Sequence, residues 1–159
     1  MSTVRMPPPA VLVAGATAAL TALTAAIGDA GLDRKLLALS RLRASQINGC
    51  ASGVAAAAYQ ARQHGASSDQ LDAVAAWRET PWFRDEERAA LALTESVTRL
   101  ADQLDPVPDR MWDTAATFFD CRELAVLLLN IAITNANNRL DAPTRQQAGT
   151  RHPATTERN

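Results

Sequence analysis

The 159-residue sequence predicts a single all-α domain. Three observations lead to this prediction: apolar residues recur at helical spacing, no stretch alternates as a strand does, and capping residues and prolines divide the chain. Hydrophobic residues make up 47% of the sequence and charged residues 21%, which is enough apolar material for a folded core. We expect six or seven helices.

Three helices are expected in the first third of the chain. A nearly uncharged, alanine-rich run after three prolines predicts a buried helix over residues 10–27. Alanine contributes little to membrane partitioning, so this run is not interpreted as a membrane span or a secretory signal. Asp33 is the expected cap of the second helix and Gly49 its left-handed end. The third helix begins at or just after Cys50 and ends at Gly65.

Capping residues also mark the helices further along. Ser67 and Gln70 have capping-box spacing and open a short helix that ends at Trp77. Asp85 is the expected cap of the next helix, and Asp120 with Glu123 forms another box. The later helices are expected over residues 86–103, 109–119 and 124–140. The last of these is apolar nearly all round, so we expect it to lie centrally.

The expected helical domain covers residues 10–140. Residues 1–9 are interpreted as a flexible N-terminus and residues 141–159 as a flexible, polar tail. We find no internal repeat.

The charge balance and the cysteine count limit the classes of function. The formal net charge is −1, which gives no electrostatic argument for nucleic-acid binding. A basic cluster on the second helix is interpreted as a solvated or inter-subunit face; it comprises Arg34, Lys35, Arg41 and Arg43. The two cysteines, Cys50 and Cys121, match no zinc pattern and no disulfide framework. We expect a cytoplasmic protein with no metal, cofactor or membrane partner.

A motif with a recognisable order lies around the first cysteine. The run Ser45-Gln46-Ile47-Asn48-Gly49-Cys50 resembles that of the alkylhydroperoxidase-D-like branch of the carboxymuconolactone decarboxylase superfamily. The segments 75–83, 87–95 and 135–140 also fit that family, in the right order and at the right distances. The resemblance implies an AhpD-like helical fold, assembly into homo-oligomers, and a redox centre at Cys50.

The sequence departs from the family at that redox centre. The resemblance implies a second cysteine, a histidine and a glutamate around Cys50, where this chain has Gly53, Ala57 and Ala38; Ser52 replaces the usual aromatic residue. The family's cycle needs a second thiol to close a disulfide and a base to accept the thiol proton. We therefore expect that no covalent partner and no proton acceptor lies within reach of Cys50.

Other residues are weaker candidates for chemistry. Cys121 could replace the lost thiol only if folding brings its Cα within ~4.4–6.8 Å of that of Cys50. His64 lies too far along its helix to act as the base for Cys50. Tyr59 is a candidate for lining a pocket. Arg78 with Glu79 and Asn135 with Arg139 are interpreted as structural pairs, and the tryptophans and phenylalanines as core or subunit contacts.

Three hypotheses on function remain open. The first is a family member without the two-cysteine peroxidase cycle, which acts as a binding or structural oligomer or uses another small-molecule pocket. The second is a residual one-cysteine alkylhydroperoxidase, an antioxidant enzyme in which Cys50 is the catalytic residue and an external thiol reductant is the partner. The third, ranked last, is a lactone decarboxylase-like enzyme, because Ala38 and Ala57 lack acid–base groups.

Overall fold

The computed structural model describes residues 3–101 and 103–149, which form eight α-helices, one 3₁₀ helix and no strand. The elements are α1 (Pro9–Leu12), α2 (Ala16–Asp29), α3 (Arg34–Ile47), α4 (Ala51–Gln63), α5 (Ser68–Ala73), η1 (Val74–Glu79), α6 (Asp85–Thr98), α7 (Asp109–Ala116) and α8 (Cys121–Thr144). The all-α prediction is confirmed. The α-helices exceed the expected six or seven because the first predicted helix is divided in two.

The division of that first helix lies at Gly15. This residue has φ +81°, a left-handed conformation that glycine adopts without steric cost, and it directly precedes α2. The side chain of Thr17 donates a hydrogen bond to the carbonyl of Ala10 across the break. The chain therefore turns between α1 and α2 instead of continuing as one rod.

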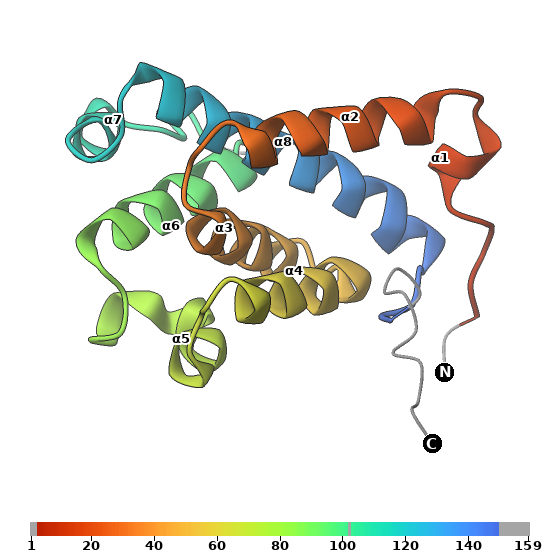
Figure 1. The fold of residues 1–159 in the computed structure, drawn as a ribbon, viewed down its shortest axis with the longest axis horizontal. Coiled ribbons are helices and arrows are strands. Elements are labelled where there is room, and N and C mark those ends of the chain that lie inside the picture. Colours follow the sequence, from red (N-terminus) through yellow and green to blue (C-terminus); the bar gives the residue numbers. More distant parts are fainter. Residues whose placement is uncertain (1–2, 102, 150–159) are drawn as a thin grey trace.

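Helix α3 lies at the centre of the fold and packs against α4, α6 and α8 (Figure 1). It contributes to two separate apolar cores. Leu36 and Leu37 face the core formed with α6, α7 and α8. Leu39 and Leu42 face the core formed with α4, α5 and η1. Because α3 is shared, the residues on either side of it have fixed positions relative to one another.

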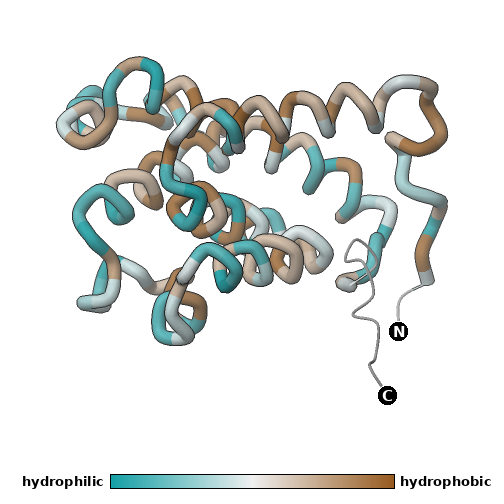
Figure 2. Tube along the Cα trace, in the orientation of Figure 1, coloured by the Kyte–Doolittle hydropathy of each residue, from teal (hydrophilic) through white to brown (hydrophobic). Residues whose placement is uncertain are grey.

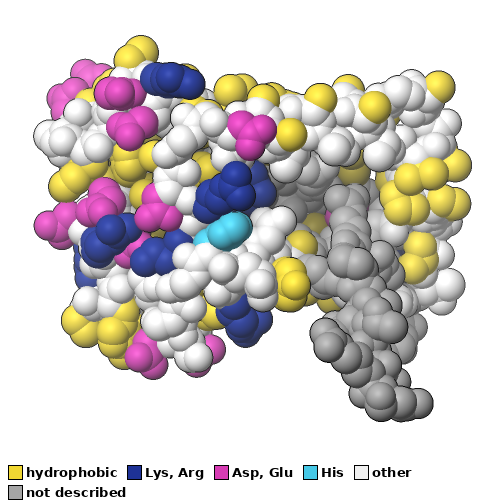
Figure 3. Space-filling model, viewed as in Figure 1, with side chains coloured by type: hydrophobic (Ala, Val, Ile, Leu, Met, Phe, Trp, Pro, Cys, Tyr) yellow, Lys and Arg dark blue, Asp and Glu magenta, His cyan; other side chains and the backbone are white. Residues whose placement is uncertain are grey.

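Helix α2 runs across α8 and is mostly exposed, so the expectation that it is buried is wrong (Figure 1). Only Ile27 of its fourteen residues is buried. Apolar residues follow its whole length and continue into α1, and they gather on the same part of the surface (Figures 2 and 3). No helix within the described ranges combines the length and the apolar character that a membrane crossing requires.

Helix α8 is longer than the sequence predicted. It begins at Cys121 and ends at Thr144, four residues beyond the expected boundary at residue 140, with Pro143 in its last turn. The N-terminal segment meets this end of the helix, because the backbone N–H of Arg5 donates to the Thr144 carbonyl and its guanidinium to the Pro143 carbonyl. Residues 150–159 of the expected tail lie outside the described residues.

The capping predictions explain most helix starts. Asp33 accepts hydrogen bonds from the backbone N–H groups of Lys35 and Leu36, and both predicted capping boxes are present. The cap of α6 is Arg84, with Asp85 as the first helical residue. Helices α6 and α7 end earlier than expected, at Thr98 and Ala116.

Candidate functional site

Cys50 caps the N-terminus of α4, directly after Gly49, which has the predicted left-handed φ of +61°. Its side chain is buried, with 1% exposed. The Cys50 Sγ lies 3.4 Å from Ser52 Oγ, and Ser52 Oγ donates a 2.8 Å hydrogen bond to Asp141 Oδ2. The prediction that no proton acceptor lies within reach of the sulfur is therefore wrong: one hydroxyl links the thiol to a buried carboxylate.

The direction of these hydrogen bonds identifies the thiol as a donor. An ionised carboxylate only accepts hydrogen bonds, and a serine hydroxyl has a single proton to give. Because the Ser52 hydroxyl donates its proton to Asp141, it can only accept a hydrogen bond in its contact with Cys50. In this arrangement the Cys50 thiol donates to Ser52 Oγ, and Ser52 Oγ donates to Asp141.

Gly53 stands where the family has its second cysteine, and its surroundings leave no space for a side chain. A Cβ at this position would lie 2.6 Å from Asn138 Oδ1 and 2.7 Å from Ser45 Oγ. These two buried side chains are hydrogen-bonded to each other at 3.2 Å, so neither is free to move away. The space that a second thiol needs is occupied by polar side chains of α3 and α8.

The other predicted positions also lack redox groups. Ala38 and Ala57 are buried and belong to the core between α3 and α4. Both cysteines are free thiols, Cys50 buried and Cys121 exposed. Cys121 is the first residue of α8, and Asp141, which is linked to Cys50 through Ser52, lies twenty residues later on the same helix. That separation corresponds to about 30 Å along the helix axis. Cys121 is therefore not a disulfide partner for Cys50 within one chain.

A cavity of about 430 Å³ lies next to the Ser52–Asp141 pair, between α2, α3, α4 and α8. This volume lies in the range typical of small-molecule sites. Side chains one and two helical turns apart line it on α4 and α8, so each helix presents one face to it. The polar lining residues are Thr24, Arg41, Ser45, Ser52, Gln60, Thr134, Asn137, Asn138 and Asp141, and Tyr59 also lines the cavity, as the sequence suggested.

Arg41 is the cationic residue of this cavity. Its Nε donates to Asn130 Oδ1 at 2.6 Å and its Nη1 to Gln60 Oε1 at 3.2 Å, and both acceptors are neutral amides. Burial lowers the pKa of the Arg41 guanidinium from its ordinary value. Guanidinium groups nevertheless remain charged in proteins, so Arg41 is a partly buried positive charge.

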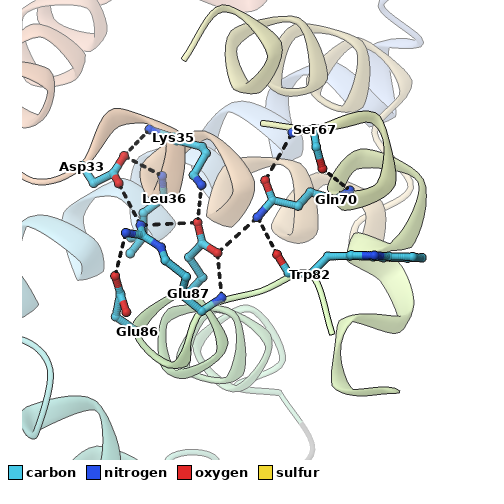
Figure 4. A network of polar contacts seen from close by, with 9 residues as sticks. Asp33, Lys35, Leu36, Ser67, Gln70, Trp82, Glu86 and Glu87 are labelled. Carbon is cyan, nitrogen blue, oxygen red and sulfur yellow. Dashed lines mark hydrogen bonds and ion pairs between the residues drawn. The ribbon is translucent and has the colours of Figure 1, made fainter. Parts of the chain in front are cut away.

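Two buried glutamates, Glu87 and Glu95, have cationic partners. Glu87 lies 2.8 Å from Lys35 Nζ and also accepts from Gln70 and the backbone of Arg84 (Figure 4). This network joins α3, α5 and α6. The basic cluster was predicted to be a solvated or inter-subunit face. The solvated interpretation is wrong for Lys35, Arg41 and Arg43, because all three make contacts inside the fold.

Glu95 is the centre of a second ionic network. It accepts hydrogen bonds from Arg43 and Arg78, each at 2.6 Å, and from the Trp77 indole at 3.1 Å. Burial acts to raise the pKa of this carboxyl, but these hydrogen bonds outweigh it and hold the pKa below its ordinary value. Arg78 thus pairs with Glu95, and the predicted pair with Glu79 is wrong.

Sequence reasoning located Cys50, Ser52 and Gly53 but missed the groups that surround them. Asp141 was assigned to the tail, and Arg41 to a solvated or inter-subunit face. One signal was available: Asn130, Thr134, Asn138 and Asp141 recur at helical spacing and form a polar stripe along α8. No cluster of three or more His, Cys, Asp or Glu side chains suited to a metal ion occurs in the described part of the chain.

The comparisons with known proteins agree with the motif around Cys50. Residues 14–96 match the carboxymuconolactone decarboxylase family. The uncharacterized protein YdfG of Bacillus subtilis (strain 168) is 30% identical over 112 residues, which cover 70% of this chain and 75% of YdfG. The uncharacterized protein YnjA of Escherichia coli (strain K12) is 32% identical over 111 residues, 70% of this chain and 59% of YnjA.

Solved structures share the fold over most of the chain. A protein of unknown function from Agrobacterium tumefaciens, proposed to be the antioxidant defence protein AhpD, superimposes with a TM-score of 0.85. It is 30% identical, and the match covers 92% of this chain and 98% of the other. The debrominase Bmp8, in a variant bound to 2,3,4-tribromopyrrole, has a TM-score of 0.76 at 18% identity, with 92% and 80% covered. At that identity the likeness concerns the fold alone.

Proposed function

Because the chain belongs to the carboxymuconolactone decarboxylase family, as the motif around Cys50 predicted, we propose that it binds a small molecule in the cavity between α2, α3, α4 and α8. In this proposal the cavity takes the place of the two-cysteine peroxidase centre. The observation that carries it is the environment of Gly53. Ser45 and Asn138, which fill the space beside Gly53, are also lining residues of the cavity.

The chemistry that this cavity offers is acid–base chemistry. Ser52 and Asp141 both line it, and their hydrogen bond holds the carboxylate at the cavity wall, where it can exchange a proton with a bound molecule. A positioned acid or base contributes typically ~10²–10⁴-fold to a reaction rate. We infer that Asp141 is the group that exchanges a proton with the bound molecule, with Ser52 orienting it.

The alternative, a one-cysteine alkylhydroperoxidase, is disfavoured by the contacts of Cys50. Among the described residues, the polar contact of the Cys50 sulfur is with the Ser52 hydroxyl at 3.4 Å, and no cationic group contacts it. The dipole of α4 offers a thiolate at its N-terminus only about 0.3–1 kcal/mol. The buried sulfur is also absent from the cavity lining.

A fragment screen tests whether the cavity is a binding site. We expect small polar fragments to bind the wild-type chain, detected by ligand-observed NMR, and to lose binding in Ala56→Phe, which fills the cavity. Ala132→Phe is the matched control, because Ala132 is exposed on α8 and does not line the cavity. Fragments that bind wild type and Ala56→Phe equally well, or no binding at all, would refute the proposal.

A further inference from the structure

We propose that the end of the cavity at Arg41 is a carboxylate-binding subsite, so that the molecule bound there is a small organic acid. This inference rests on the proposed function, because it names the class of molecule that the same cavity takes. Two independent observations carry it: the contacts of Arg41 and the buried amide of Asn138.

Arg41 carries a positive charge that no neighbouring carboxylate neutralises. Within the described ranges, no acidic oxygen approaches its guanidinium to ion-pair distance, whereas Arg43, Arg78 and Arg84 each have at least one acidic partner. Its two hydrogen bonds, to Asn130 and Gln60, use two of the five N–H groups of a guanidinium. The remaining N–H groups are donors for a ligand at a position that lines the cavity.

Asn138 is the second observation. Its side chain is 3% exposed and lines the same cavity, and its Oδ1 accepts from Ser45. Its Nδ2 is buried with no hydrogen-bond partner among the described residues. Buried amide donors are normally paired, so an unpaired one beside a cavity indicates a missing acceptor. Asn138 lies eight residues, or about 12 Å, beyond Asn130 on α8, so its donor faces the far end of the molecule that Arg41 binds and marks a place for a second acceptor atom of that molecule.

The carboxylate of Asp141 does not compete for this subsite. Arg41 contacts Asn130 on α8, and Asp141 lies eleven residues further along the same helix, about 16 Å at 1.5 Å per residue. On α4 the corresponding contacts are Gln60 and Ser52, eight residues or about 12 Å apart. The cavity thus has a cationic end and an acidic end. An organic acid bound at Arg41 would extend its remaining atoms toward Ser52 and Asp141.

The number and shape of the donors favour a carboxylate over a phosphate. A guanidinium presents its N–H groups in one plane, which matches the two coplanar oxygens of a carboxylate. Arg41 is the lone arginine among the described lining residues, and no lysine accompanies it. A phosphate dianion would therefore keep an uncompensated charge in this cavity.

A pair of probes that differ in charge but hardly in shape tests the assignment. We expect benzoate to bind the wild-type chain roughly tenfold more tightly than benzamide, with ¹⁵N–¹H NMR shifts at the amides of Arg41, Gln60 and Asn130. Arg41→Gln should bring benzoate down to the affinity of benzamide. Arg62→Gln, which removes an exposed charge from α4 outside the cavity, should leave the tenfold preference unchanged.

The outcomes separate this inference from the proposed function. Equal binding of benzoate and benzamide, a preference that survives Arg41→Gln, or tighter binding of inorganic phosphate than of benzoate would each overturn the carboxylate assignment. In those cases, neutral fragments that bind the wild-type chain but not Ala56→Phe would still support a small-molecule cavity. Should Arg41→Gln unfold, Arg41→Lys provides the second variant. It keeps the charge but not the planar set of N–H groups, and an unchanged preference for benzoate over benzamide there would contradict the inference.

Discussion

Gly53 is a helical glycine that packs directly against two buried polar side chains, Ser45 and Asn138. The family motif alone identified it as the position of the lost cysteine. The sequence could not show that Ser45 and Asn138 fill the vacated space, because these residues lie on other helices. Gly53→Cys would therefore have to displace a buried hydrogen-bonded pair of side chains.

The packing around Gly53 predicts the effect of adding one methyl group. Gly53→Ala gains about 1 kcal/mol of helix propensity but must push apart a buried hydrogen-bonded pair, and overpacking costs about 1–3 kcal/mol. We expect a net loss of about 1 kcal/mol or more in the free energy of unfolding, measured by urea denaturation.

Gly28 provides the matched control for this substitution. It is also helical, and a Cβ built there meets no atom within 4 Å. Gly28→Ala is therefore expected to stabilise the protein by up to about 1 kcal/mol. If both substitutions stabilised the protein equally, the space beside Gly53 would be open, contrary to the described packing.

The positions of Arg41 and Asp141 in the cavity lining could not be predicted from the sequence. Their residue types are common on exposed helix faces, and a local reading assigns such charges to solvent. Which of them faces a cavity depends on how α3 and α8 pack against α4, and that packing involves residues nearly a hundred positions apart.

At the scale of the elements, the helix starts were predictable because capping is local. Asp33, Ser67 and Asp120 each satisfy backbone N–H groups within three residues of themselves. The end of α8 was missed because a proline normally marks the end of a helix. Pro143 instead lies in the last turn, and the hydrogen bonds from Arg5 to the carbonyls of Pro143 and Thr144 come from the other end of the chain.

The network around Glu95 joins η1, α3 and α6 and makes their association depend on pH. The folded pKa of Glu95 lies below its ordinary value of 4.5, so its contribution to stability is complete above that value. This contribution is lost as the pH falls through the lower folded pKa. We expect Glu95→Gln to lower the free energy of unfolding by about 2–3 kcal/mol at pH 7, because hydrogen bonds to charged groups are lost.

Denaturation at several pH values checks this prediction. The difference between wild type and Glu95→Gln should shrink on acidification below pH 4.5. Glu79→Gln is the control, because Glu79 is exposed in η1, and its substitution should change stability by less than about 0.5 kcal/mol. A difference that stays constant down to pH 2 would show that Glu95 has no depressed pKa.

At the scale of the whole molecule, α1 and α2 remain incompletely packed. No charged residue occurs between Arg5 and Asp29, and Val11, Leu12 and Val13 are each more than half exposed. Contiguous exposed apolar surface of this kind is typical of subunit contacts. We propose that a second copy of this chain covers α2, in line with the homo-oligomer that the family resemblance implies.

Sedimentation velocity tests this proposal. We expect the wild-type chain to sediment as an oligomer at micromolar concentration and Ala22→Glu, on the exposed side of α2, to shift it toward the monomer. Ala75→Glu introduces the same charge at an exposed position of η1 and should leave the oligomer intact. A wild-type chain that is monomeric throughout this range would contradict the proposal.

The central claim is that this fold has replaced thiol chemistry with a polar small-molecule cavity. Its most direct test is stopped-flow consumption of an organic hydroperoxide, with dithiothreitol as the external reductant, by wild type and Cys50→Ser. The buried, hydrogen-bond-donating thiol predicts that both proteins consume peroxide at the same negligible rate. A peroxide consumption rate that is well above background and disappears in Cys50→Ser would contradict the account.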